Sequence, residues 1–169
     1  GYASDYYYYG NGGGISALAD GSSVVTRLFS DTASFGDITL TSAGGSDIFV
    51  AKVTPSGAWE WALSAGGTSG DLGYGISALA DGSSVVVGSF RSSTASFGSI
   101  SLTSAGSQDI FVALIESTPG NGSVSSSPTP LPTVSPSPSE SMFDWVVSAG
   151  GTSGDQGKSI SALAAGPPV

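Results

Sequence analysis

One block of sequence occurs twice in this chain, and the rest is arranged around it. The string Gly-Ile-Ser-Ala-Leu-Ala-Asp-Gly-Ser-Ser-Val-Val spans residues 14–25 and returns unchanged at 75–86. A third start, with serine in place of the leading glycine, begins at Ser159. Self-similarity of this kind is the signature of repeat architectures, whose units stack because one unit alone cannot bury its hydrophobic face. We therefore expect an N-terminal arm at 1–13, a first repeat at 14–74, a second at 75–158 and the opening strand of a third at 159–169.

Within each repeat the pattern predicts four short β-strands and no helix. Apolar residues alternate with polar ones, or form short runs, between turn signals such as Asp20-Gly21 and Pro55-Ser56-Gly57. Trp59, Trp61 and Leu63 fall on one face of the last strand, so we expect that face to form the core. The expected strands of the first repeat are 15–19, 23–29, 47–53 and 59–63, with a loop at 32–45.

The second repeat is interrupted by a segment rich in proline, serine and threonine, at about 117–141. Proline fixes φ and removes amide donors, which favours a solvated, polyproline-like arm. The repeat then resumes, because residues 143–151 match the pattern of 59–67. The segment is therefore expected to lengthen a hairpin tip, where added residues cost little.

The composition excludes several classes of function. The chain has no cysteine and no histidine, which removes disulfides, thiolate nucleophiles, imidazole bases and the common zinc sites. Its formal charge of −9, with only four basic residues, argues against nucleic acid and anionic membranes as partners. No apolar run reaches the length of about 20 residues that spans a bilayer. We expect a protein that is not an enzyme, has no cofactor and does not insert into membranes.

Aspartates recur with the repeat, and two of them lie in Gly-Thr-Ser-Gly-Asp loops. These are Asp71 and Asp155, which are weak calcium candidates because carboxylates in glycine loops are calcium-type ligands. The favoured interpretation is that they shape turns, since neither loop has the alternating aspartates of an EF-hand. Asn121 begins an Asn-Gly-Ser sequon, which makes it a candidate glycosylation site in a glycosylating host.

The N-terminal arm contains four consecutive tyrosines: Tyr6, Tyr7, Tyr8 and Tyr9. Tyrosine suits a half-buried strand, so an edge strand or packed arm is the favoured interpretation. The alternative is an exposed aromatic patch that stacks on sugar rings, which would make the chain a cell-surface adhesion or glycan-binding module.

Several strings, at 47–53, 61–67, 70–76 and 85–90, occur in an order and spacing that resemble the bacterial seven-bladed β-propeller (SBBP) repeat. The resemblance implies tandem four-stranded antiparallel, propeller-like blades in an exported or cell-surface bacterial protein, with no catalytic residues. Arg27 departs from the pattern, because the second repeat has Gly88 at that position. An exposed blade face or a local shift of the strand is the favoured explanation, and a binding arginine is the alternative. A closed propeller needs about four to eight blades. Two blades and an opening strand are an incomplete propeller, to be completed by other copies or by missing chain.

The opening strand of the third repeat predicts self-assembly. Residues 160–164 would expose unpaired backbone groups unless another chain supplies an edge, so Ile160, Ala162 and Ala164 are the candidate assembly residues. We expect an extracellular structural protein that associates with itself into a ring or filament, and that becomes monomeric or unfolded when 159–169 are removed.

Overall fold

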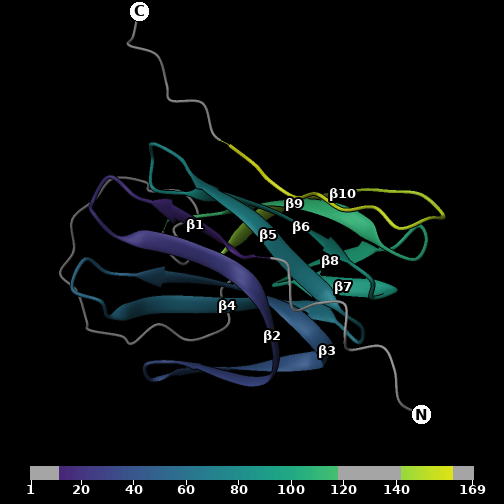
Figure 1. Cartoon of the computed structure of the whole chain (residues 1–169), viewed down its shortest axis with the longest axis horizontal. Helices are drawn as coiled ribbons and strands as arrows, with labels where there is room; N and C mark the ends of the chain where they lie inside the picture. The colour runs from purple at the N-terminus through teal and green to yellow at the C-terminus, as the bar shows by residue number, and fades with distance from the viewer. Residues whose placement is uncertain (1–11, 118–141, 162–169) are drawn as a thin grey trace, which may run out of the picture.

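The computed structural model describes residues 12–117 and 142–161, and every regular element in these two ranges is a β-strand (Figure 1). The all-β prediction is therefore confirmed at the level of fold class. No helix in the described ranges is long and apolar enough to cross a membrane. The strands are β1 (Gly14–Ala17), β2 (Ser23–Phe35), β3 (Ile38–Val53), β4 (Trp59–Gly67), β5 (Asp71–Ala78), β6 (Ser84–Phe90), β7 (Thr94–Phe97), β8 (Ile100–Thr103), β9 (Asp109–Ile115) and β10 (Phe143–Ala149).

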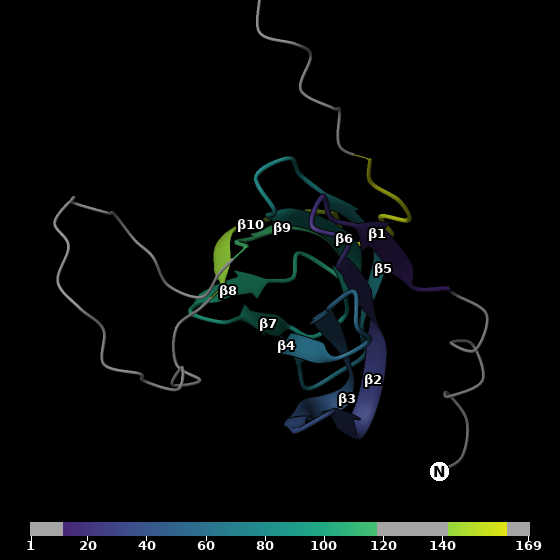
Figure 2. The same ribbon diagram turned by 90° about the vertical axis from the view of Figure 1, so that its left-hand side faces the viewer.

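The strands form two antiparallel sheets, and one of them contains strands of both repeats. One sheet has the order β1-β2-β3-β4-β7-β8, and the other has the order β10-β9-β6-β5. The first repeat supplies β1 to β4, but β7 and β8 come from the second repeat and extend the sheet of the first. Figure 2 shows the resulting curled arrangement, in which β7 and β8 lie between β4 and the strands β9 and β10. The repeats therefore do not form two independent four-stranded units.

The turns follow from the Asp-Gly pairs, as predicted. In the first repeat the amide of Leu18 donates to the carbonyl of Ser22 at 2.8 Å, and Gly21 has a φ of 81°. In the second repeat the amide of Leu79 donates to the carbonyl of Ser83 at 2.8 Å, and Gly82 has a φ of 86°. Glycine adopts this left-handed conformation without the steric cost that a side chain adds. The same local sequence therefore produces the same hairpin twice.

The loop predicted at 32–45 is wrong. β2 continues to Phe35 and β3 begins at Ile38, and the two strands pair from Thr32↔Thr41 to Phe35↔Ile38. The alternation of Ile38 and Leu40 with threonines is a strand pattern, and it is realised as a hairpin extension. We call residues 32–41 the edge hairpin; its counterpart in the second repeat is β7–β8.

The core predicted on the β4 face of Trp59, Trp61 and Leu63 is confirmed only in part. Trp59 is 38% exposed, whereas Trp61 and Leu63 are half-buried and pack at the margin of the core. The largest fully buried side chains are instead the phenylalanines 90, 97 and 111, which belong to the second repeat. One continuous core joins both repeats, because β5, β6, β7 and β9 cover the apolar face that the first repeat cannot cover itself.

The segment after the proline-rich tract returns to the sheet in the register of the first repeat. Ala51 pairs with Ala62 and Val50 with Leu63 across β3 and β4. Across β9 and β10, Ala113 pairs with Val146 and Val112 with Val147. β10 is therefore the structural counterpart of β4, although residues 118–141 lie outside the described part of the chain.

Candidate functional site

The candidate site is the place where the second repeat attaches to the first. Three residues at the end of β4 pair with three residues of β7: Ala65↔Phe97, Gly66↔Ser96 and Gly67↔Ala95. Ala65 is 4% exposed, and Ala95 and Phe97 are fully buried. We call this pairing, together with Asp71 and Ser92, the repeat junction.

Asp71 is the polar centre of the repeat junction and is fully buried. One carboxylate oxygen accepts hydrogen bonds from the amide of Gly67 and the hydroxyl of Ser92, both at 2.8 Å. The other accepts from the amides of Arg91 at 2.8 Å and Ser92 at 3.2 Å. The Ser92 hydroxyl in turn accepts from the amide of Ser69 at 2.9 Å. Asp71 therefore links the turn after β4 in the first repeat to the residues before β7 in the second.

This arrangement shows what the calcium candidate Asp71 does. Both of its oxygens accept hydrogen bonds from N–H or O–H donors, so this buried carboxylate has a structural role. Within residues 12–117 and 142–161, no group of three or more histidine, cysteine, aspartate or glutamate side chains is arranged to hold a metal ion.

A second carboxylate, that of Asp47, reaches the same junction from β3. Its Oδ2 accepts from the amide of Ala43 at 2.6 Å, and its Oδ1 is buried without a hydrogen-bond partner. A Cβ atom on Gly66 would lie 2.5 Å from Oδ1 of Asp47 and 2.9 Å from Oδ2 of Asp71, so the two carboxylates converge on this glycine. Burial raises the pKa of Asp47, and the charge of Asp71 acts in the same direction, against the hydrogen bond from the amide of Ala43.

The second repeat carries the same set of groups at the end of β10. The Oδ2 of Asp109 accepts from the amide of Ala105 at 2.5 Å, and its Oδ1 is buried without a partner. A Cβ atom on Gly150 would collide with that Oδ1. The amide of Gly151 donates to Oδ2 of Asp155 at 3.1 Å, as Gly67 does to Asp71. The first half of a repeat junction is therefore built twice.

The two copies differ in what covers them. Asp71 is fully buried beneath Ser92 and β7, whereas Asp155 is partly exposed and no strand of the described ranges pairs with the outer edge of β10. A shallow, open pocket of about 460 Å³ lies there, lined by Ile110, residues 149–153 and Asp155.

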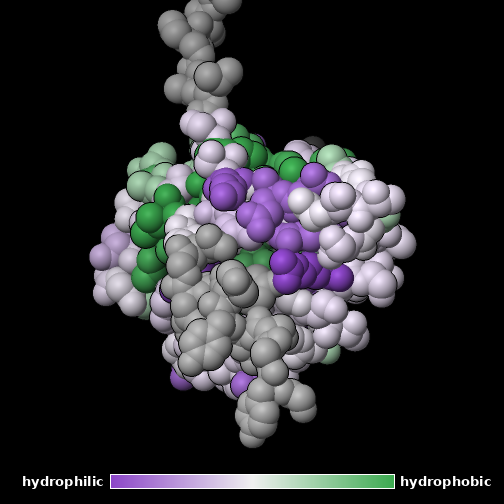
Figure 3. Space-filling model, turned by 45° about the vertical axis from the view of Figure 1, so that its right-hand side comes forward, coloured by the Kyte–Doolittle hydropathy of each residue, from purple (hydrophilic) through white to green (hydrophobic). Residues whose placement is uncertain are grey.

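The outer face of β10, formed by Trp145, Val147 and Ala149, is exposed. Trp145 is 40% and Val147 55% exposed. Their counterparts on β4, Trp61 and Leu63, are half-buried against the shared core. Figure 3 shows, on one face of the molecule, hydrophobic areas at the margins of a hydrophilic patch. Apolar surface is thus left uncovered in the described chain, and an edge strand with an exposed apolar face favours association.

The edge hairpin of the first repeat is the second uncovered element. Its Phe35 ring lies 5.0 Å from the rings of both Phe49 and Trp59, at angles of 50° and 87°. In the second repeat the Phe97 ring lies 4.8 Å from that of Phe111 and 5.6 Å from that of Phe143, at 54° and 88°. Each repeat therefore holds its hairpin in the same way. β7 pairs with β4, but no described strand pairs with the outer edge of Thr32–Phe35, because β1 pairs with β2 only up to Thr26.

The predicted assembly residues lie only partly within the described ranges. A Cβ atom on Gly75 would lie 3.1 Å from Cα of Ser159 and 3.2 Å from the nitrogen of Ile160. The same atom on Gly14 would lie 2.7 Å from the nitrogen of Ile76, so the third repeat starts to stack on the second as the second stacks on the first. Ile160 is not in a strand. The other predicted site residues, Ala162, Ala164, Asn121 and Tyr6 to Tyr9, lie outside the described residues.

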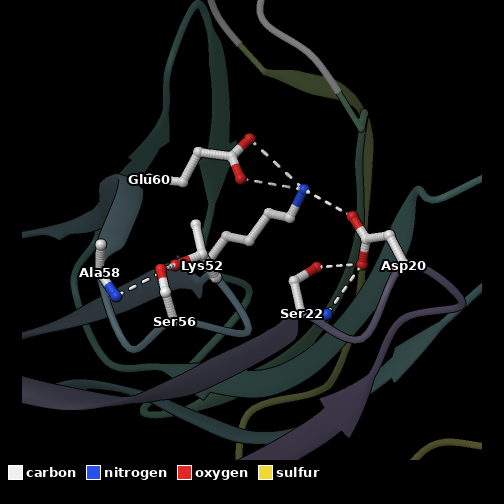
Figure 4. A network of polar contacts seen from close by, with 7 residues as sticks. Asp20, Ser22, Lys52, Ser56, Ala58 and Glu60 are labelled. Carbon is white, nitrogen blue, oxygen red and sulfur yellow. Dashed lines mark hydrogen bonds and ion pairs between the residues drawn. The ribbon is translucent and has the colours of Figure 1, made fainter.

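One polar cluster belongs to the first repeat only. The Nζ of Lys52 lies 3.3 Å from Asp20 and 3.2 Å from Glu60 (Figure 4). Hydrogen bonds from Ser22, and then the interaction with Lys52, lower the pKa of Asp20 to about 2. The position of Lys52 is occupied by Leu114 in the second repeat, so this cluster is not part of the repeated site. Arg27 is exposed, as expected from the sequence.

Sequence reasoning missed Ser92 and the paired glycines Gly67 and Gly151. The signal was available, because Ser-x-Thr-Ala-Ser-Phe-Gly occurs at 30–36 and again at 92–98, but the loop predicted at 32–45 includes most of the first string. No protein family model matches the chain, and no curated protein matches it either. The function is therefore inferred from the geometry of the repeat junction.

Proposed function

We propose that this protein is a non-enzymatic structural protein, extracellular and built of propeller-type SBBP repeats, that associates with itself into a filament or ring. The observation that carries the proposal is the contrast between β4 and β10. The same strand is covered by a hairpin of the next repeat in one place and exposes Val147 and Trp145 in the other.

The buried aspartates support a structural role. Asp71 accepts hydrogen bonds from backbone and hydroxyl donors of two repeats, and Asp47, Asp109 and Asp155 each accept from a backbone amide of their own repeat. Asp71 joins the two repeats, and the other three carboxylates fix loops within their own repeat. Propeller-like closure by several copies is part of the proposal, because a closed ring needs four or more blades.

The test is the size of the full chain in solution. Sedimentation velocity over a hundredfold range of protein concentration is expected to show mass that increases with concentration. Because each copy carries a charge of −9, association is expected to strengthen when salt screens the repulsion. A mass equal to one chain at all concentrations and salt levels would contradict the proposal.

A further inference from the structure

We infer that the end of β10 in one copy pairs with the edge hairpin of a second copy, and that this contact reproduces the repeat junction. The expected register is Ala149 opposite the second copy's Phe35, Gly150 opposite its Ser34 and Gly151 opposite its Ala33. The inference rests on the proposed self-association and specifies its surface.

Sequence identity at both halves of the junction is the first argument. Residues 148–155 repeat residues 64–71 without change, as Ser-Ala-Gly-Gly-Thr-Ser-Gly-Asp. Residues 30–41 match 92–103 at every position except three. The chain therefore contains two copies of each half of the junction, and its own fold joins one of each.

Both unused halves already have the conformation that their counterparts have in the repeat junction. The aromatic contacts of Phe35 and Phe97 agree in distance and angle, which places the two hairpins alike on their own repeats. On the other side, Gly150 is held against Asp109 and Gly151 donates to Asp155. Little reorganisation is needed, so little of the association free energy is lost in ordering.

The polar groups of the two halves are complementary as well. In the repeat junction the Ser92 hydroxyl donates to Asp71 and accepts from the amide of Ser69. The counterparts are the second copy's Ser30 with Asp155 and Ser153. The Ser30 hydroxyl now pairs at 2.9 Å with that of Ser46 on the exposed surface, and it must rotate to reach Asp155.

One further segment has to move in this arrangement. The place beside β5 is taken by Ser159 and Ile160, and β1 of the second copy would occupy the same place. The two segments share the sequence Ile-Ser-Ala-Leu-Ala, so either one can fill it. Association should therefore persist when residues 159–169 are removed, whereas assembly through the terminal strand itself predicts that it is lost.

The decisive variant is Gly151→Val. A Cβ atom there meets nothing within 4 Å, so the isolated chain should fold normally. At the counterpart Gly67, a Cβ atom would collide with the carbonyl oxygen of Thr94 and lie 2.7 Å from Cβ of Ser92. Gly151→Val should therefore clash with Thr32 and Ser30 of the second copy and weaken association about tenfold or more. Ala19→Val is the control, because Ala19 is exposed in the β1–β2 turn and its counterpart Ala80 stays exposed where the second repeat packs on the first.

The opposite side of the contact is tested with Ala33→Arg. Ala33 is half-buried, whereas its counterpart Ala95 is fully buried in the junction, so a long charged side chain fits the single chain and not the contact. Circular dichroism checks that both variants remain folded.

The two variants are then mixed. Each alone should be monomeric, but the hairpin of Gly151→Val and the β10 edge of Ala33→Arg are both intact, so an equimolar mixture should form a dimer and nothing larger. If both variants associate as strongly as the wild type, this inference is wrong, although the proposal of self-association is still supported. A monomeric wild type with amides of 149–151 protected from exchange would show that the chain covers its own edge, and would overturn both.

Discussion

β4 and β10 end in the same sequence and have the same register on their neighbours, yet they differ in burial. Ala65 is 4% exposed and its counterpart Ala149 is exposed, and Leu63 is half-buried where Val147 is 55% exposed. The local sequence cannot cause the difference, because residues 64–71 and 148–155 are the same. The second repeat causes the difference: its hairpin β7–β8 pairs with the end of β4, and its strands β5, β6 and β9 supply much of the core against which Leu63 packs. In this fold the burial of a residue is decided by the neighbouring repeat.

The largest effect that tests this comparison is expected from Asp71→Ala against Asp155→Ala. Asp71→Ala leaves the amides of Gly67, Arg91 and Ser92 and one hydroxyl without their acceptor in a buried junction. Since each buried unsatisfied donor costs about 1–3 kcal/mol, we expect the free energy of unfolding to fall by about 3 kcal/mol or more. Asp155→Ala removes one hydrogen bond at a partly exposed position and should cost about 1 kcal/mol or less.

Urea denaturation followed by tryptophan fluorescence measures both values, at a protein concentration low enough to keep the chain monomeric. Equal losses in the two variants would mean that the uncovered copy is buried as deeply as the covered one, contrary to the comparison.

The sequence predicted the parts of the fold that depend on local chemistry. Asp20-Gly21 and Asp81-Gly82 form the expected turns, and the period-two runs form strands. It did not predict that β7–β8 would join the sheet of the other repeat, because the partner of a strand edge is set by long-range packing. The prediction of Trp59 as a core residue fails for the same reason: alternation gives the face of a strand on which a residue lies, but which face is covered depends on the neighbouring sheet.

Sequence analysis favours a turn-shaping role for Asp71 and Asp155, and the hydrogen bonds from Gly67 and Gly151 are of that kind, but it did not predict that Asp71 joins the two repeats. Asp71 and Asp155 were singled out because they recur in glycine loops, but a carboxylate that binds calcium and one that accepts backbone amides look alike in sequence. The hydrogen bond from Ser92, a residue of the other repeat, identifies the role of Asp71.

A smaller effect is expected where two carboxylates meet in the covered junction. Burial, and then the charge of Asp71, raise the pKa of Asp47 above its usual value of 3.8. The folded chain thus holds this proton more tightly than the unfolded chain does, so the free energy of unfolding falls as pH rises from about 4 through the raised pKa. Asp47→Asn keeps an oxygen for the amide of Ala43 and removes the charge.

We expect Asp47→Asn to be modestly more stable than the wild type at pH 7, with the difference shrinking toward zero below pH 4. Thermal unfolding between pH 3 and pH 8 measures it, and Asp37→Asn, which removes the same charge from an exposed turn, is the control. A variant that is less stable at pH 7 and unchanged in its pH dependence would show that the charged form of Asp47 does not destabilise the folded chain.

The smallest effect is expected from making the first repeat resemble the second at Lys52. Lys52→Leu copies Leu114 and removes contacts to Asp20 and Glu60, whose side chains are 58% and 45% exposed. Exposed ion pairs contribute about 0–1 kcal/mol, and the lysine side chain is itself only 13% exposed, so leucine recovers part of that as apolar burial. The free energy of unfolding should change by less than about 1 kcal/mol.

Nuclear magnetic resonance titration gives a sharper readout: because Ser22 is the largest cause of the low pKa of Asp20, that pKa should stay well below 3.8 in the variant. A return to 3.8 would mean that Lys52, and not the hairpin turn shared by both repeats, controls this carboxylate.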